Sequence, residues 1–174
     1  MNLTPVMQKF IVHWGEMGTR WGVNRTVAQI HALLYLSPEP LDADTICTTL
    51  GVARSNASTS LKELQSWGLV KVAHVLGDRR DHFVTLTEVW DIFDCIVAER
   101  KKRELIPTLE LLRQCEQEAA AEKDLPPLVR ERIGSMGQFL VQLTDWHTQM
   151  AQLPRATLLK LMKLGTRITR IFTS

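Results

Sequence analysis

The sequence predicts a mainly α-helical fold in which a helix-turn-helix is followed by a two-stranded β-hairpin, the wing, with flanking helices that form a dimerisation region. Three observations predict this winged helix-turn-helix. Two short helical segments meet at a glycine, two extended runs enclose the polar turn LGDRRD, and apolar residues recur every three or four positions on both sides of this block.

Two helices are expected in the first 36 residues. The first runs from about Pro5 to Arg20, and Gly22 ends the run. Asn24 can cap the second helix, which spans Arg25 to Leu36 before a Pro-rich stretch. One face of the first helix carries large apolar residues at helical spacing, namely Met7, Phe10, Trp14, Met17 and Trp21. Such a row of side chains needs a partner helix.

The helix-turn-helix follows Leu41. Asp42 is a good N-cap for a short helix that extends through Leu50, and Gly51 supplies the tight turn after it. A second helix spans about Ala53 to Trp67, and Gly68 provides a left-handed stop.

The hairpin comes next. The run from Leu69 to Val75 is rich in Val and Leu, and a second extended run covers His82 to Leu86. The turn between them carries the adjacent arginines Arg79 and Arg80.

The second half is expected to be entirely helical. Thr87 can cap a long helix that reaches about Leu105, and Pro107 marks a break or kink before the helical period continues toward Ala121. Pro126 and Pro127 open another helix, and Pro154 separates the last one. That last helix carries a basic stripe, for which a solvated face is the simpler interpretation: Lys160, Lys163, Arg167 and Arg170.

Composition excludes several classes of protein. The chain has 174 residues, 45% of them hydrophobic, and a net charge of +2, so a basic footprint is not evident from charge alone. The start lacks a secretory signal and no long uncharged apolar run occurs, which predicts a cytoplasmic protein without a membrane partner. Scattered histidines, the absence of a nucleophile or phosphate-loop motif, and three distant cysteines predict no enzyme, no cofactor and no metal site. A redox-sensing thiol is the alternative for the cysteines.

The second helix of the helix-turn-helix presents a small, polar outer face, and such short donors and acceptors can approach base edges in a major groove. Any soluble helix has a polar face, so this face alone does not indicate DNA binding. The DNA-binding interpretation depends on the position of the helix after a helix and a tight turn and before a hairpin. Arg79 and Arg80 at the hairpin tip suit a minor groove. The expected DNA-binding residues are Arg54, Ser55, Asn56, Ser58, Thr59, Lys62, Arg79 and Arg80.

The chain is accordingly divided into three parts. Residues 1–23 form an N-terminal helix of the dimer region, residues 24–87 form the winged helix-turn-helix, and residues 88–174 form a helical dimerisation and regulatory region. A homodimer would present two recognition helices to a pseudo-palindromic site in double-stranded DNA. The alternative is a winged-helix protein-interaction module without sequence-specific DNA binding, which has no need for paired arginines at its wing tip.

A ligand site is suggested by the tryptophans outside the reading helix, because aromatic faces hold quaternary ammonium groups through cation–π attraction. The candidate residues are Trp14, Trp21 and Trp90. The simpler interpretation is that these side chains fill the helix seam and the dimer core.

Long motifs carry a family resemblance. The run GDRRDHFVTLT at Gly77 to Thr87 resembles the wing of MarR-type regulators. The runs WGEMGTRWGVNRTVAQIHALLYLSPEPLDADTI and VARSNASTSLKELQSWGLVKV resemble the GbsR branch of that superfamily, and the resemblance covers roughly residues 8–112. It implies a homodimeric winged-helix regulator, commonly a repressor, linked to osmoprotectant genes such as those for choline and glycine betaine.

Overall fold

The computed structural model describes the backbone of residues 1–172 and the side chains of residues 1–164. It contains two compact units, residues 1–100 and residues 101 onward. The first unit holds the N-terminal helix, the winged helix and the helix after the wing, so it is larger than the span 24–87 expected for the winged helix-turn-helix. The side chains of Arg167 and Arg170, from the expected basic stripe, lie outside the described residues.

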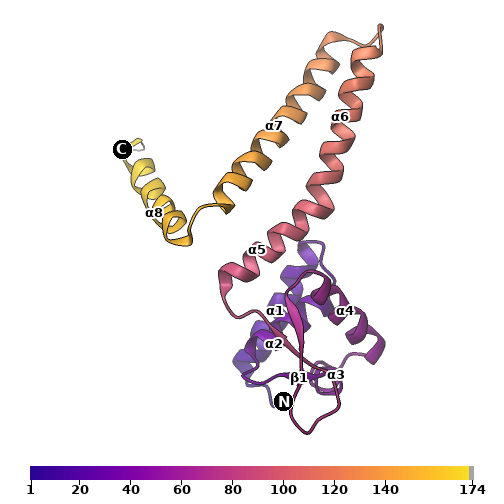
Figure 1. Cartoon of the computed structure of the whole chain (residues 1–174), viewed down its shortest axis with the longest axis vertical. Coiled ribbons are helices and arrows are strands. Elements are labelled where there is room, and N and C mark those ends of the chain that lie inside the picture. The colour runs from indigo at the N-terminus through magenta and orange to yellow at the C-terminus, as the bar shows by residue number, and fades with distance from the viewer. Residues whose placement is uncertain (173–174) are drawn as a thin grey trace. The chain divides into compact units, whose positions relative to one another are not determined.

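Four helices precede the hairpin (Figure 1), and their ends follow from local chemistry. They are α1 (Pro5–Arg20), α2 (Arg25–Leu36), α3 (Ala43–Leu50) and α4 (Arg54–Ser66). As expected, the Asn24 side chain accepts a hydrogen bond from the Thr26 amide at 2.8 Å and caps α2. Gly51 ends α3 with a φ of 66°, a left-handed conformation that glycine adopts without steric cost.

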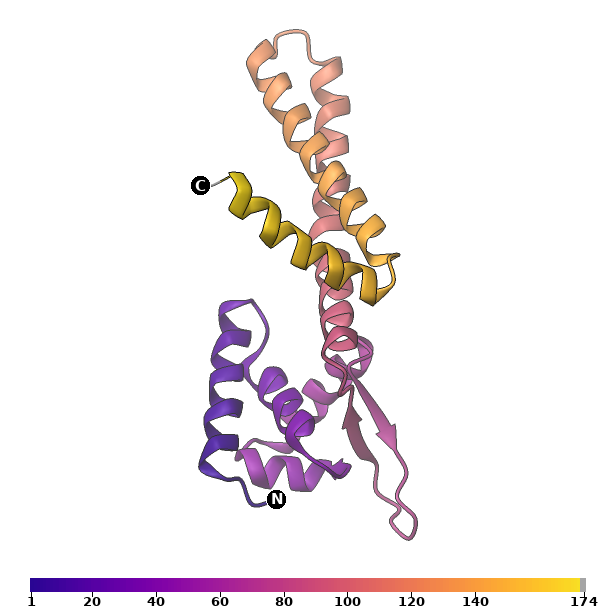
Figure 2. The same ribbon diagram turned by 90° about the vertical axis from the view of Figure 1, so that its left-hand side faces the viewer.

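The sheet has three strands rather than the two expected. They are β1 (Leu41–Asp42), β2 (Val70–Ala73) and β3 (His82–Thr85), in the order β1-β3-β2, with all pairs antiparallel. Leu41 pairs with Phe83 at the added edge. A two-residue strand has no periodicity that a sequence pattern can detect. Beyond the sheet, β2 and β3 continue into an extended turn that forms the wing (Figure 2).

The core of the first unit is built around α2, because seven of its residues are buried. The largest side chains with almost no solvent exposure come from α2, α3, α4 and β2 with its flank: Val27, Ile30, Leu33, Ile46, Leu64, Leu69 and Val70. On α1, Ile11 belongs to this core, and Phe10 and Trp14 from the apolar row pack against it. The α1 row therefore finds its partner helix within the unit, in α2.

The helix after the wing differs from expectation at its start. It is α5 (Val89–Arg100), and its first turn is held by Glu88, whose Oε1 accepts from the Trp90 amide at 3.4 Å. Thr87 is therefore not the cap that the sequence pattern suggested.

A short π-helical segment, η1 (Lys101–Leu105), precedes α6 (Ile106–Ala121), and Pro107 is the second residue of α6. A proline inside a helix removes an amide donor and crowds the carbonyl four residues earlier. The wider π-turn accommodates this constraint, so the expected break takes the form of a change in helix type.

In the second unit, α6 packs along α7 (Pro127–Ala151), and α8 (Arg155–Phe172) follows. Figures 1 and 2 both show α6 and α7 side by side as an antiparallel hairpin. At Gly137 the Glu116 side chain of α6 occupies the space that a Cβ on α7 would fill. Proline opens α7 as expected.

His31 on α2 is a buried polar residue whose ring lacks a hydrogen-bond partner at one nitrogen. Among the described residues, its Nε2 has no hydrogen-bond partner. Burial lowers the pKa of His31 to about 4, because the charged imidazolium is disfavoured away from water.

We expect stability to fall with acidity because of His31. The unfolded chain takes up the proton near pH 6.5 and the folded chain near pH 4, so this contribution is complete above pH 6.5 and is lost as the pH falls. This difference in pKa corresponds to a decrease of about 2 kcal/mol in the free energy of unfolding between pH 7.5 and pH 5. Urea unfolding at both values should show it, and His31→Leu should flatten the difference. An exposed control, His74→Leu, should leave the difference intact, and an unchanged slope in His31→Leu would refute the assignment.

Candidate nucleic-acid interface

The candidate reading helix is α4, and its two faces differ in residue type. Its inner face is buried in the core and consists of Ala57, Ser60, Leu61 and Leu64. All six residues of this helix that were expected to bind DNA are exposed: Arg54, Ser55, Asn56, Ser58, Thr59 and Lys62. The structure thus brings these six side chains together on one surface, where short polar groups and two cations alternate.

The start of α4 is open. Ala53 occupies the N-cap position, and no side chain accepts a hydrogen bond from the first amides of the helix. Amides at a helix start carry partial positive charge and bind phosphate oxygens readily. Beside them, Arg54 forms an exposed ion pair with Asp44 of α3.

At the wing, Arg80 is held by two carboxylates. Its Nε and Nη2 donate to Asp78 at 3.0 and 2.5 Å, and its Nη1 lies 3.2 Å from Asp42 Oδ2. The Arg80 amide also donates to Asp78 at 3.0 Å. Hydrogen bonds from the Arg80 side chain and amide hold the pKa of Asp78 well below its usual range, so this carboxylate stays ionised.

Asp42 connects the wing to the helix-turn-helix. Its Oδ1 accepts from the amides of Asp44 and Thr45, which caps α3, and its Oδ2 accepts from the Thr45 hydroxyl and pairs with Arg80. Burial by itself would raise the pKa of Asp42. Hydrogen bonds from Thr45 and the positive charge of Arg80 outweigh burial, so the pKa of Asp42 lies below its usual value.

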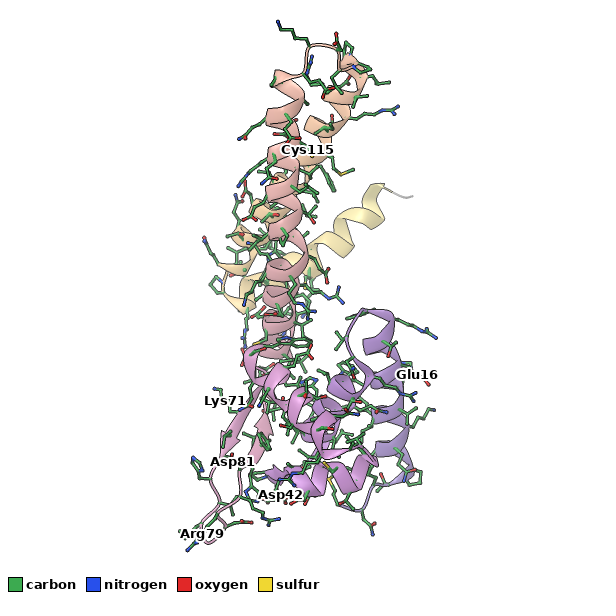
Figure 3. All side chains as sticks on the ribbon, turned by 90° about the vertical axis from the view of Figure 1, so that its right-hand side faces the viewer. Glu16, Asp42, Lys71, Arg79, Asp81 and Cys115 are labelled. Carbon is green, nitrogen blue, oxygen red and sulfur yellow. The ribbon has the colours of Figure 1, made fainter. Side chains whose placement is uncertain are left out.

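Arg79 differs from its neighbour. Figure 3 shows it at the tip of the wing, directed away from the rest of the hairpin. Within the described part of the chain it has no acidic partner, and the neighbouring Asp81 does not pair with it. One arginine of the pair therefore shapes the turn, and the other extends into solvent.

A cleft separates α4 from the wing. It has a volume of about 350 Å³ and is lined by residues that include Arg54, Ser58, Lys62 and Arg80. The candidate residues of the helix and the wing thus border one hollow.

The three candidate tryptophans do not form one cage. Trp14 and Trp21 line a narrow cavity of about 60 Å³, where the Arg100 guanidinium lies 5.6 Å from the centre of the Trp21 ring. Trp90 does not line that cavity and instead meets Phe93 edge to face, with ring centres 6.0 Å apart.

Trp14 also lines a second, larger cavity of about 230 Å³ between α1, α2 and α5. Its aromatic wall consists of Phe10, Trp14 and Tyr35, with ring centres 5.5 Å apart for Phe10 and Trp14 and 6.4 Å apart for Phe10 and Tyr35. His31 lies between the two cavities and lines both. Sequence reasoning missed Tyr35 and His31, although the only tyrosine of the chain and a histidine in an apolar helix were visible signals.

Other kinds of site find no support in the described residues. No group of His, Cys, Asp and Glu side chains there could hold a metal ion, and no helix there is long and apolar enough to span a membrane. The three cysteines are free and half-buried. Burial, with Asp91 and Asp94 nearby, raises the pKa of Cys95, which makes its thiol less reactive.

Comparison with solved structures gives the class of fold. A crystal structure described as a transcriptional regulator aligns with a TM-score of 0.56 at 20% identity, covering 86% of this chain and all of that one. A mutant of Staphylococcus aureus MepR bound to an oligodeoxyribonucleotide covers 79% of this chain at 14% identity, but its TM-score of 0.39 is too low for an argument. This chain thus shares the fold of that structure.

Residues 21–81, about a third of the chain, match the family model for the MarR family. This segment contains α2, the helix-turn-helix, β2 and the turn of the wing. Over this segment the chain is therefore similar to the MarR family. No curated protein matches the chain.

We expect Asp42→Ala to destabilise the first unit by about 2 kcal/mol, because it removes the cap of α3 and one partner of Arg80. The neighbouring Asp44→Ala removes only an exposed pair with Arg54 and should cost less than about 1 kcal/mol. Urea denaturation of the two variants provides the measurement. Equal losses would show that Asp42 does not connect the wing to α3.

Proposed function

We propose that this protein is a homodimeric, sequence-specific DNA-binding repressor that acts in the cytoplasm on osmoprotectant genes. The observation that carries the proposal is the surface shared by α4 and the wing. There, an exposed row of short polar side chains lies beside a hairpin whose tip presents Arg79. The MarR-family match to residues 21–81 supports the same function.

In this proposal α4 enters a major groove. Ser55, Asn56 and Thr59 approach base edges, while Arg54 and the open amides of the helix start contact phosphate. Arg79 enters the adjacent minor groove, where a narrow, A·T-rich segment concentrates negative potential. Arg80 keeps the turn in shape through Asp78 and Asp42. Two copies would read half-sites about 34 Å apart.

Support for the osmoprotectant role comes from the resemblance of residues 8–112 to the GbsR branch and from the aromatic cavity. Phe10, Trp14 and Tyr35 line a cavity of about 230 Å³ with three aromatic rings. Aromatic rings bind quaternary ammonium groups through cation–π attraction. Trp21 suits this role less well, because the cationic side chain of Arg100 already covers its ring. A ligand there would change DNA affinity only if it bound one dimer arrangement more tightly than another.

Selection of bound sequences from random duplex DNA tests the main proposal. We expect a pseudo-palindrome with half-sites about one helical turn apart, and an affinity that falls as the salt concentration rises. Arg79→Ala and Arg80→Ala should each weaken binding to the selected site, and Arg79→Ala should also reduce the salt slope by about one.

Lys9→Ala is the matched control, because it removes one exposed positive charge from α1 rather than from the wing. If only unselective binding or none emerges under reducing conditions, the protein-interaction module becomes the better explanation. If both arginine variants behave like Lys9→Ala, the wing does not contact DNA.

Calorimetry tests the effector. Choline or glycine betaine at millimolar concentration should give a binding heat that Trp14→Leu abolishes, since Trp14 lines the aromatic cavity. Trp90→Leu should keep that heat, because Trp90 does not line the cavity. If titration into the unmodified protein gives no heat beyond that of dilution, the quaternary ammonium proposal is wrong.

A further inference from the structure

Leu76, in the turn of the wing, is a large apolar side chain that the fold does not bury. It is 103% exposed, so the described part of the chain covers none of it. The adjacent Val75 is exposed as well. Figure 2 shows that the turn projects beyond the sheet. Leu76 therefore contributes nothing to the core of the first unit.

The backbone of the turn determines where Leu76 lies. The Asp78 amide donates to the Val75 carbonyl at 3.1 Å, which closes a turn from Val75 to Asp78. Gly77 has a φ of 85°, and among the described residues only glycines have a positive φ. A negative φ at the second residue followed by a positive φ at the third is typical of a type II turn. Leu76 is thus the second residue of such a turn and occupies its corner.

The turn is also held together by Arg80. The Arg80 amide donates to Asp78 Oδ1 at 3.0 Å, and its guanidinium binds both Asp78 and Asp42. Because these bonds form within the chain itself, little conformational entropy remains to be lost when the turn meets a partner. The wing therefore presents an apolar side chain from a corner that is already ordered.

The size of the exposed apolar surface restricts the partner. Leu76 and Val75 together offer much less than the area of about 800 Å² that each partner buries in a specific protein interface. A second copy of the chain is therefore not the partner that the turn fits. A membrane fits no better, because even a whole acyl chain gives only marginal membrane binding.

The charge beside Leu76 favours double-stranded DNA. Arg79 lies three residues further along the chain, has no acidic partner in the described residues, and is directed away from the hairpin in Figure 3. A minor groove has anionic walls and apolar base faces within. A cation next to an exposed leucine matches both features of this groove.

We propose that Leu76 inserts as an apolar wedge at a base step of the minor groove that Arg79 enters. The inference rests on the proposed DNA-binding function and adds a residue that selects sequence through the deformability of DNA. Apolar side chains placed at a base step partly unstack it and kink the duplex. Pyrimidine–purine steps unstack most easily. A TA step contains only A·T pairs, so it suits the wedge and Arg79 together.

Selection from random duplex DNA with the full-length protein tests the wedge. For the unmodified protein we expect a TA step at a fixed position beside each half-site, where the wing meets the minor groove. Leu76→Ser removes the apolar side chain and should abolish that enrichment. The bases that α4 contacts in the major groove should remain selected, because Leu76 lies on the wing.

Affinity and bending give a second measurement on the selected site. Leu76→Ser should weaken binding about tenfold, because the contact buries most of the leucine. The salt slope should stay unchanged, since no charge is lost, whereas Arg79→Ala lowers it. Energy transfer between labels at the two ends of the duplex should show a smaller bend. Leu76→Met keeps an apolar side chain and should restore both affinity and bend.

Val6→Ser is the matched control, because it removes a 77% exposed apolar side chain from α1 rather than from the wing. Urea denaturation should give all three variants the stability of the unmodified protein. If Leu76→Ser binds and bends the selected site as Val6→Ser does, or keeps the TA enrichment, the wedge alone is wrong. If no site is selected at all, the proposed DNA-binding function is wrong and the wedge with it.

Discussion

The geometry of the winged helix depends on the carboxylate of Asp42. One oxygen caps α3 and the other receives the Thr45 hydroxyl and Arg80, while its backbone lies in β1 beside β3. The same side chain thus contributes to the start of the helix-turn-helix, the edge of the sheet and the base of the wing. Because a partly buried carboxylate is costly without partners, the three elements are stabilised together.

Sequence reasoning was most successful where a residue determines its own backbone. Asn24, Gly51 and Gly68 ended or began helices as expected, because capping oxygens and positive φ angles are local properties. It failed where a partner distant in sequence decides. Leu41 is a strand residue because of Phe83, and Arg80 pairs with Asp42, which is distant in sequence, because the fold brings β1 beside the wing. The bond of Arg80 to Asp78, by contrast, is local to the turn.

The aromatic row of α1 shows how one face can serve both the core and a cavity. Phe10 and Trp14 pack on the core, yet both also line the hollow that reaches Tyr35 and Ile92. His31 stays neutral between the two cavities because burial lowers its pKa. Trp14 therefore serves as a packing residue and as a candidate ligand residue at the same time, whereas Trp90, of the three candidate tryptophans, lines neither of these two cavities.

The acidic partners of the arginines also bear on how such a reader would search for its site. Arg54 and Arg80 are neutralised by their own neighbours, which leaves Lys62 and Arg79 as the cations of this surface without an acidic partner in the described chain. Attraction to arbitrary DNA scales with the number of phosphates neutralised. A reader with few unpaired cations would gain little affinity for unrelated sequence, so its choice of site would depend mainly on the contacts that α4 makes with the bases.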